Sequence, residues 1–247
     1  MRTAVRPDPH QDTYFVSLND LLVGLLFIFI VLLMTYSMIF QDSVERLERQ
    51  LTERVDMRTE LLERIKAKLV GAGFDAEVVA DEGVLRLPEG VLFAPGQAIL
   101  GDRARGALTI IADALRSELP CFGAKRQLQY CGRNSGAILE AVYIEGHTDD
   151  VAINNQQFRS NWELSSARAI ATYNQLVKAQ PTLKALPNAT GSAALLGASA
   201  YADTRRVAKS EHPTAADRQR NRRVDFRFLL SPPSHVEINA AARNAAK

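Results

Sequence analysis

Residues 14–40 read YFVSLNDLLVGLLFIFIVLLMTYSMIF, an apolar run in which Asp20 is the only charged residue. At 1.5 Å per residue such a run forms about 40 Å of helix, enough to cross a bilayer with some tilt. A secretory signal peptide is the alternative, but its apolar core is shorter and ends in a small-residue cleavage site. This run continues instead into Tyr36, Met38 and Phe40. We therefore predict a transmembrane helix over residues 14–40.

Asp20 is the first functional candidate, because a carboxylate inside a membrane segment is costly and persists where a partner, a water-filled cavity or a function compensates it. The structural alternative is a helix-start residue near the interface, where a carboxylate favours the positive end of the helix dipole. Residues 14–18 already look membranous ahead of it, which places Asp20 about 10 Å inside the span. We therefore favour an ion-translocating role for Asp20.

The chain beyond the span has room for one soluble domain of ordinary size. It has 247 residues in all and a formal net charge of +2, so charge predicts no nucleic-acid partner. Charge also leaves the orientation in the membrane open, since arginines lie on both sides of the span. Residues 1–13 are expected to form a short polar tail.

Residues 41–70 combine many charges with one apolar stripe, which predicts an amphipathic linker helix that continues the membrane helix. The stripe contains Leu47, Leu51, Val55, Leu62, Ile65 and Leu69. Two uses of it remain open: a contact between two copies, or packing of one helix on its own domain. A strict heptad would place Arg54 and Arg58 in the seam, which argues against a long coiled coil.

Strand and helix patterns alternate after this linker helix. Strand-like or short apolar segments occupy residues 76–80, 83–87, 139–145, 193–200 and 224–230, and helix patterns occupy 102–119, 160–179 and 215–220. This order predicts an α+β fold with a mixed-sheet α/β sandwich domain over residues 71–230 and a polar tail over 231–247.

Residues 144–169 read IEGHTDDVAINNQQFRSNWELSSARA. This pattern resembles the peptidoglycan-binding domain shared by OmpA, Pal and the flagellar stator subunit MotB, and its second half is most similar to the MotB form. Matching residues recur at 199–203 and 221–224, so the resemblance covers about residues 83–230. It implies an OmpA-like fold with peptidoglycan as the ligand.

A peptidoglycan stem peptide offers a diaminopimelate, with an ammonium and a carboxylate on one carbon. A carboxylate beside a guanidinium complements this group, because arginine grips a carboxylate bidentately. By resemblance, the ligand-binding positions are Asp149, Asn161, Leu164 and Arg168. A structural ion pair is the alternative for Asp149 and Arg168, and we expect Arg168 to lie at the surface. Arg222 and Arg223 are weaker candidates: one is expected to support Asp149 and the other to face solvent.

No nucleophile–base pair, phosphate-binding glycine loop or paired catalytic carboxylates occur in the sequence, so we predict neither enzymatic activity nor a cofactor. His147, Asp149 and Asp150 suggest a metal-ligand set. No second cluster completes a coordination shell, however, and we predict no metal site.

The two ends of the chain constrain each other, since peptidoglycan lies outside the inner membrane. The N-terminus is then cytoplasmic and the domain periplasmic, an oxidising compartment in which Cys121 and Cys131 are expected to form a disulfide. A single Asp-bearing span before a wall-binding domain resembles the B subunits of ion-driven motors. That resemblance implies a homodimer inside a ring of MotA/ExbB-like subunits, with Asp20 carrying H⁺ or Na⁺.

Within that group, the membrane segment is most similar to the MotB-like subunit ZorB of Zorya anti-phage defence systems. The resemblance therefore implies a peptidoglycan-anchored motor subunit in phage defence. A flagellar stator subunit is one alternative. A passive wall tether of the OmpA or Pal kind is the other, and a tether needs no buried acid.

Overall fold

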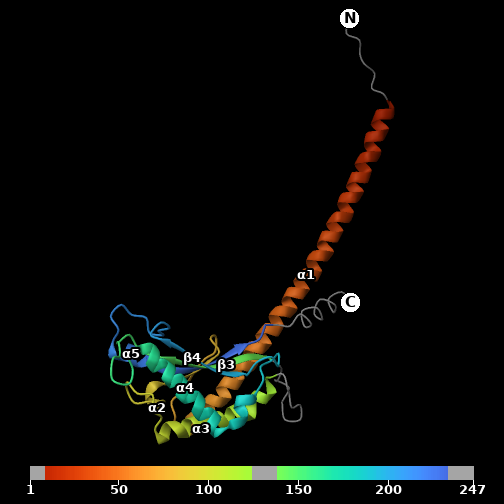
Figure 1. Cartoon of the computed structure of the whole chain (residues 1–247). Helices are drawn as coiled ribbons and strands as arrows, with labels where there is room; N and C mark the ends of the chain where they lie inside the picture. Colours follow the sequence, from red (N-terminus) through yellow and green to blue (C-terminus); the bar gives the residue numbers. More distant parts are fainter. Residues whose placement is uncertain (1–8, 124–137, 233–247) are drawn as a thin grey trace. The chain divides into compact units, whose positions relative to one another are not determined.

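The computed structural model describes residues 9–123 and 138–232 (Figure 1). The chain divides into two compact units, with the boundary between Leu51 and Thr52, and the second unit ends at Pro232. Cys131 lies outside the described residues, so its disulfide with Cys121 stays a prediction.

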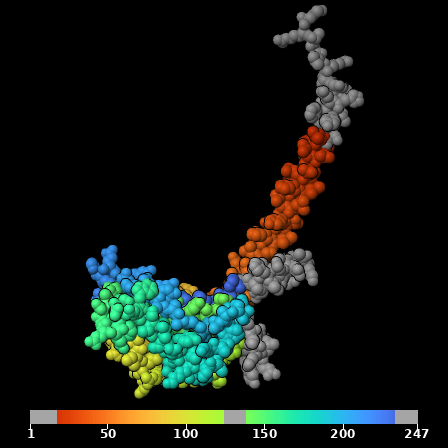
Figure 2. Space-filling model, viewed as in Figure 1, coloured from red at the N-terminus to blue at the C-terminus, as the bar shows by residue number. Residues whose placement is uncertain are grey.

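A single helix, α1 (Pro9–Gly71), contains both the predicted membrane span and the predicted linker helix. It begins at Pro9, so part of the expected polar tail is helical. The large apolar side chains from Leu18 to Phe40 are exposed, as the uncovered red and orange helix in Figure 2 shows. By length and composition alone, α1 is the one helix in the described ranges that can cross a membrane.

Five strands form one mixed sheet in the order β1-β2-β5-β3-β4. They are β1 (Glu77–Val79), β2 (Val84–Pro88), β3 (Leu139–His147), β4 (Leu196–Ala202) and β5 (Arg223–Leu230). Strands β3 and β4 are parallel, whereas the β1–β2, β2–β5 and β3–β5 pairs are antiparallel. The predicted α+β fold with a mixed sheet is confirmed.

Two long helices, α3 and α4, lie against each other and pack on this sheet (Figure 1). The helices of the domain are α2 (Glu89–Leu92), α3 (Asp102–Glu118), α4 (Asn161–Ala179) and α5 (Ala215–Asn221), with short 3₁₀ turns at Leu119–Cys121 and Pro181–Ala185. Ile111 of α3, Leu176 of α4 and Phe226 of β5 meet in one buried core. Each fully buried side chain of this size contributes about 1.5–3 kcal/mol.

The C-terminal part of α1 belongs to the same core. Leu62, Ile65 and Leu69 of the predicted stripe are buried there, whereas Leu51 and Val55 remain exposed. The sequence left two roles open for the stripe, a contact between two copies or packing on the chain's own domain. From Leu62 onward, the stripe packs on the chain's own domain. The compact unit consequently starts within the linker helix rather than at residue 71.

Arg54 and Arg58 are also buried, and both bind main-chain carbonyls. Nη1 of Arg54 donates to the carbonyl of Ser231 at 3.1 Å, and Nη2 of Arg58 donates to that of Ala80 at 2.9 Å. The Arg58 guanidinium fills the space that a Cβ at position 83 would need, and Gly83 has a φ of +65°. Only glycine suits this turn between β1 and β2.

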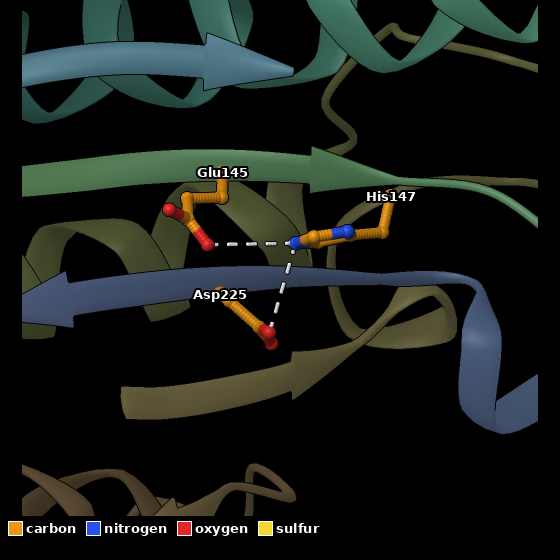
Figure 3. A group of neighbouring side chains, drawn as sticks. All are labelled: Glu145, His147 and Asp225. Carbon is orange, nitrogen blue, oxygen red and sulfur yellow. Dashed lines mark ion pairs between the residues drawn. The ribbon is translucent and has the colours of Figure 1, made fainter. Parts of the chain in front are cut away.

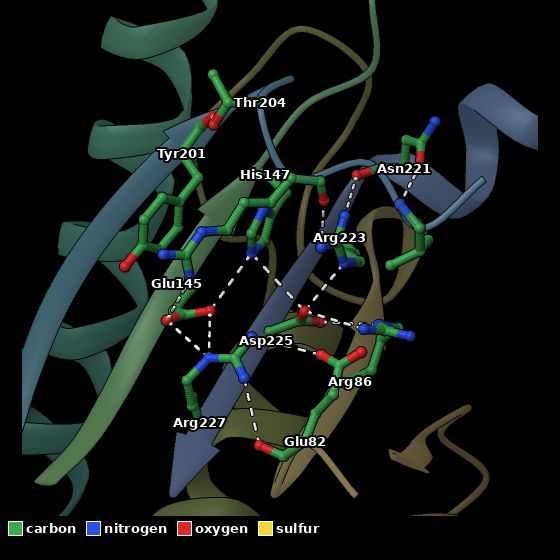
Figure 4. A network of polar contacts seen from close by, with 12 residues as sticks. Glu82, Arg86, Glu145, His147, Tyr201, Thr204, Asn221, Arg223, Asp225 and Arg227 are labelled. Atoms are coloured by element: carbon green, nitrogen blue, oxygen red, sulfur yellow. Dashed lines mark hydrogen bonds and ion pairs between the residues drawn. The ribbon is translucent and has the colours of Figure 1, made fainter. Parts of the chain in front are cut away.

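Alternate residues of β5 point to opposite faces of the sheet, as strand geometry requires. Phe226 and Phe228 enter the core, whereas Arg223, Asp225 and Arg227 lie on the other face in the polar network of Figure 4.

Candidate ligand-binding cleft

A cleft of about 420 Å³ opens where the loop after β3 meets α4 and the end of α5. Its lining includes Asp149, Asn161, Leu164, Arg168 and Arg222, which are five of the six predicted binding positions. Glu89 and Arg218, which sequence reasoning did not select, line it as well. The sixth position, Arg223, does not.

Close packing of β3 on α4 positions this cleft. Gly146 lies against α4, where an added Cβ would overlap the carbonyl oxygen of Ser165, so glycine lets the strand end approach the helix. The Asp149 loop follows directly. Helix α4 begins after Ser160, whose hydroxyl accepts the N–H of Glu163 at 3.3 Å as an N-cap.

Arg168 is buried at the base of the cleft, with 1% of its surface exposed. Its Nε donates to the carbonyl of Gln97 at 2.8 Å, and its Nη2 donates to Glu89 and to the carbonyl of Ala94. Its guanidinium also lies 5.4 Å from the centre of the Phe93 ring. Burial lowers the pKa of Arg168, and the nearby carboxylate of Glu89 opposes this shift. The expectation that Arg168 lies at the surface is wrong, because the loop at 94–97 closes over it.

Glu89 connects two arginines. One of its oxygens accepts from Arg168, and Oε2 accepts from Nε of Arg222 at 2.6 Å. Arg222 in turn donates from Nη1 to Oδ2 of Asp149 at 2.7 Å. Burial lowers the pKa of Arg222, but its hydrogen bonds to Asp149 and Glu89 outweigh that effect and leave the pKa raised. We call the row Arg168–Glu89–Arg222–Asp149 the charge row of the cleft.

Asn161 holds the loop that carries Asp149. Its Nδ2 donates to the carbonyls of Asp149 at 3.2 Å and Val151 at 3.0 Å, and its Oδ1 accepts from the N–H of Ile153 at 3.3 Å. Leu164, one turn along α4, is buried and supplies an apolar part of the wall. Asn161 therefore shapes the cleft, whereas Asp149 and Arg168 offer it charge.

The alternatives left open for Arg222 and Arg223 are resolved by their positions. Arg222 supports Asp149, as one of the two was expected to do. Arg223 does not face solvent: it is 3% exposed and donates to Asp225 at 3.0 Å and to the carbonyls of Asn221 and Arg205. As the first residue of β5 it points to the sheet face opposite the core, because its neighbour Val224 points inward.

One group of side chains in the described part of the chain has the spacing of metal ligands. It consists of Glu145 and His147 of β3 and Asp225 of β5, all buried (Figure 3). His147 Nε2 lies 3.7 Å from an oxygen of each carboxylate. His147, Asp149 and Asp150, which the sequence suggested as ligands but for which we predicted no metal site, do not form this group.

Arginines already compensate these two carboxylates. Asp225 accepts from Arg86 at 3.0 and 3.2 Å and from Arg223 at 3.0 Å, and both oxygens of Glu145 accept from Nε of Arg227 at 3.0 Å (Figure 4). A metal ion bound there would face three guanidinium groups at close range, which is electrostatically unfavourable. The cluster therefore fits a structural ion-pair network better than a cation site.

Comparison with known proteins supports the resemblance to MotB that the sequence indicates, although no protein-family model matches the chain. Motility protein B of Bacillus subtilis is 35% identical over 98 residues, which are 40% of this chain and 33% of that protein. The uncharacterized protein YtxE of the same organism is 25% identical over 244 residues, or 87% of this chain and 88% of YtxE. A crystal structure of a putative MotB-like protein from Desulfovibrio vulgaris matches with a TM-score of 0.50 and 25% identity, over 76% of this chain and 99% of that one.

The mixed sheet, the cleft and these similarities support one class of protein: the domain of this chain is similar to those of Motility protein B and the MotB-like protein. The match to Motility protein B spans only about a third of that relative. Two of these relatives have motility names and YtxE is uncharacterized, which agrees with the prediction of no enzymatic activity.

Proposed function

We propose that the chain is a peptidoglycan-anchored subunit of an ion-driven motor in the inner membrane. In this proposal α1 crosses the membrane once, with a cytoplasmic N-terminus and a periplasmic domain. Two features support it together: a helix long and apolar enough to span, and the MotB-like domain that follows.

The wall ligand is the diaminopimelate of the peptidoglycan stem peptide. The observation that carries this assignment is the charge row, which has a guanidinium at one end and a carboxylate at the other. Nε and Nη2 of Arg168 are bonded within the protein, which leaves Nη1 for a ligand carboxylate. Asp149, with 11% of its side chain exposed, accepts a hydrogen bond from the ligand ammonium.

This binding mode differs from a two-nitrogen grip through Nε and Nη2 of Arg168, because both are occupied. Addition of free meso-diaminopimelate tests the assignment. It should release the full-length chain from purified sacculi, whereas the same concentration of lysine amide, which lacks a carboxylate, should not. Equal release by both compounds would reject the diaminopimelate assignment.

The motor part rests on Asp20. Helix α1 starts at Pro9, so Asp20 lies about three turns inside it and cannot act as its N-cap. This position supports the ion-translocating hypothesis, in which H⁺ or Na⁺ binds Asp20 within a homodimer enclosed by a ring of MotA/ExbB-like subunits. An intramembrane acid of this kind is typical of ion pathways.

The biological output we propose is Zorya-type anti-phage defence, with a flagellar stator subunit and a passive wall tether as alternatives. The experiment expresses the chain with a candidate ring-forming MotA/ExbB-like subunit from the same genome and measures phage plating and swimming. Reduced plating without effect on swimming supports defence. Restored swimming of a stator-deficient strain supports the flagellar alternative, and neither effect supports the tether.

A further inference from the structure

Glu89 is the one acid in the charge row that contacts both arginines. It is 6% exposed, and its main-chain N–H donates to the carbonyl of Arg222 at 3.0 Å, so its position is fixed by the sheet as well as by its side chain. With Glu89 present, the row holds two positive and two negative groups. Its net charge is therefore zero.

We propose that Glu89 determines the ligand class of the cleft: by keeping the row neutral, it selects a zwitterionic amino-acid group over a dicarboxylate of the same length. This inference rests on the proposed function of the cleft. A ligand ammonium on Asp149 and a ligand carboxylate on Arg168 would close the row into a ring of six alternating charges. A ligand without the ammonium leaves Asp149 without a counter-charge on that side.

Removal of the Glu89 charge changes this balance in a defined direction. The row then has two guanidiniums against one carboxylate, which favours an added anion. The effect is strong because Arg168 and Glu89 are buried, and water screens buried charges little. The pair of Arg218 and Asp150 at the cleft, joined at 3.1 Å, is neutral by itself and does not alter this count.

The test measures two ligands by isothermal titration calorimetry on the full-length chain in detergent at fixed ionic strength. The ligands are meso-diaminopimelate and pimelate, which has the same seven-carbon dicarboxylate chain without amino groups. The wild-type chain should bind diaminopimelate at least tenfold more tightly. Glu89→Gln should reduce this preference by tenfold or more, through weaker binding of diaminopimelate and tighter binding of pimelate. Glu77→Gln, the same chemical change on β1, should leave the preference unchanged.

Arg222→Gln provides the opposite change, because it leaves the row with one net negative charge. Its preference for diaminopimelate should rise above that of the wild type even if its overall affinity falls, and it keeps the test valid if Glu89→Gln does not fold. The role of Glu89 would be overturned if the variants lost affinity for both ligands in parallel. It would also be overturned if Glu89→Gln and Arg222→Gln shifted the preference for diaminopimelate in the same direction. Wild-type protein that binds neither ligand would instead reject the proposed function of the cleft.

Discussion

The guanidinium of Arg168 and the carboxylate of Glu89 form an ion pair inside the cleft, although 79 positions separate them in the sequence. Their side chains are 1% and 7% exposed. Removal of either charge leaves the other buried with only part of its compensation: Glu89 keeps Arg222, and Arg168 keeps the carbonyls of Gln97 and Ala94. Such a loss inside a buried site is costly. The binding residues of the cleft are thus also structural.

Arg168→Ala should lower the free energy of unfolding by about 2–5 kcal/mol, because it leaves Arg222 as the one guanidinium bonded to Glu89 and creates a cavity. Glu89→Ala should also destabilise the chain. The double variant should lose less than the sum of the two single losses, since the interaction can be lost only once. Chemical unfolding of the full-length chain, followed by circular dichroism, measures this cycle. Strictly additive losses would contradict the coupling.

Gly83→Ala should destabilise the domain by about 1–3 kcal/mol, because a side chain there needs a strained backbone and displaces the guanidinium of Arg58. Gly106→Ala is the matched control. Gly106 lies inside α3, where an added Cβ would meet only the Phe74 ring, at an ordinary contact distance of 4.0 Å, and alanine there should stabilise the helix by about 0.5–1 kcal/mol. Melting temperatures of the two variants should move in opposite directions. Similar shifts would contradict the packing of Arg58 against this turn.

The domain should lose stability as the pH falls below about 6.5, the pKa of histidine in an unfolded chain. His147 is fully buried, and desolvation lowers its pKa in the folded state despite the carboxylates of Glu145 and Asp225. The unfolded chain therefore takes up the proton first, so the contribution of His147 is complete above this pH and declines below it. The melting temperature at about pH 5 and pH 7.5 measures the effect.

His147→Gln should show a smaller loss of melting temperature between these two pH values than the wild-type chain. His212→Gln, at an exposed position, should behave like the wild type. If His147→Gln keeps the full acid sensitivity, the buried histidine is not its source.

Asp20→Asn should abolish ion flux and biological activity while membrane insertion and assembly remain. Asparagine keeps nearly the same volume and can hydrogen-bond, but it cannot gain and lose charge. The measurement is ion flux into vesicles that contain the chain and its ring-forming partner, with phage plating in parallel. Normal flux and full resistance in the variant would show that Asp20 is not the ion carrier.

The sequence predicted the fold well because its strands and helices have strong periodic patterns. The strand and helix at 139–145 and 160–179 correspond closely to β3 and α4. It also indicated Asp149 and Arg168 through a motif. It did not indicate Glu89, because an acid after Pro88 looks like an ordinary helix-start residue, and only the pairing of β2 with β5 brings it to Arg222.

Burial was likewise invisible from local patterns. The sequence predicts Arg168 at the surface and indicates no burial of Arg54 or Arg58. Each of the three is nevertheless enclosed by segments distant in the sequence. When the partners of an arginine are main-chain carbonyls, the sequence around that arginine gives no signal of the contact. Tertiary contacts decide such cases.

Sedimentation with purified sacculi tests the central claim, that the charge row binds the cell wall. The full-length wild-type chain in detergent should pellet with sacculi and remain in solution once they are digested with lysozyme. Asp149→Asn, which removes the carboxylate at the open end of the row but preserves its shape, should reduce pelleting at least tenfold without a change in the circular dichroism spectrum. Glu77→Gln should pellet like the wild type. Undiminished pelleting of a folded Asp149→Asn chain would contradict the account.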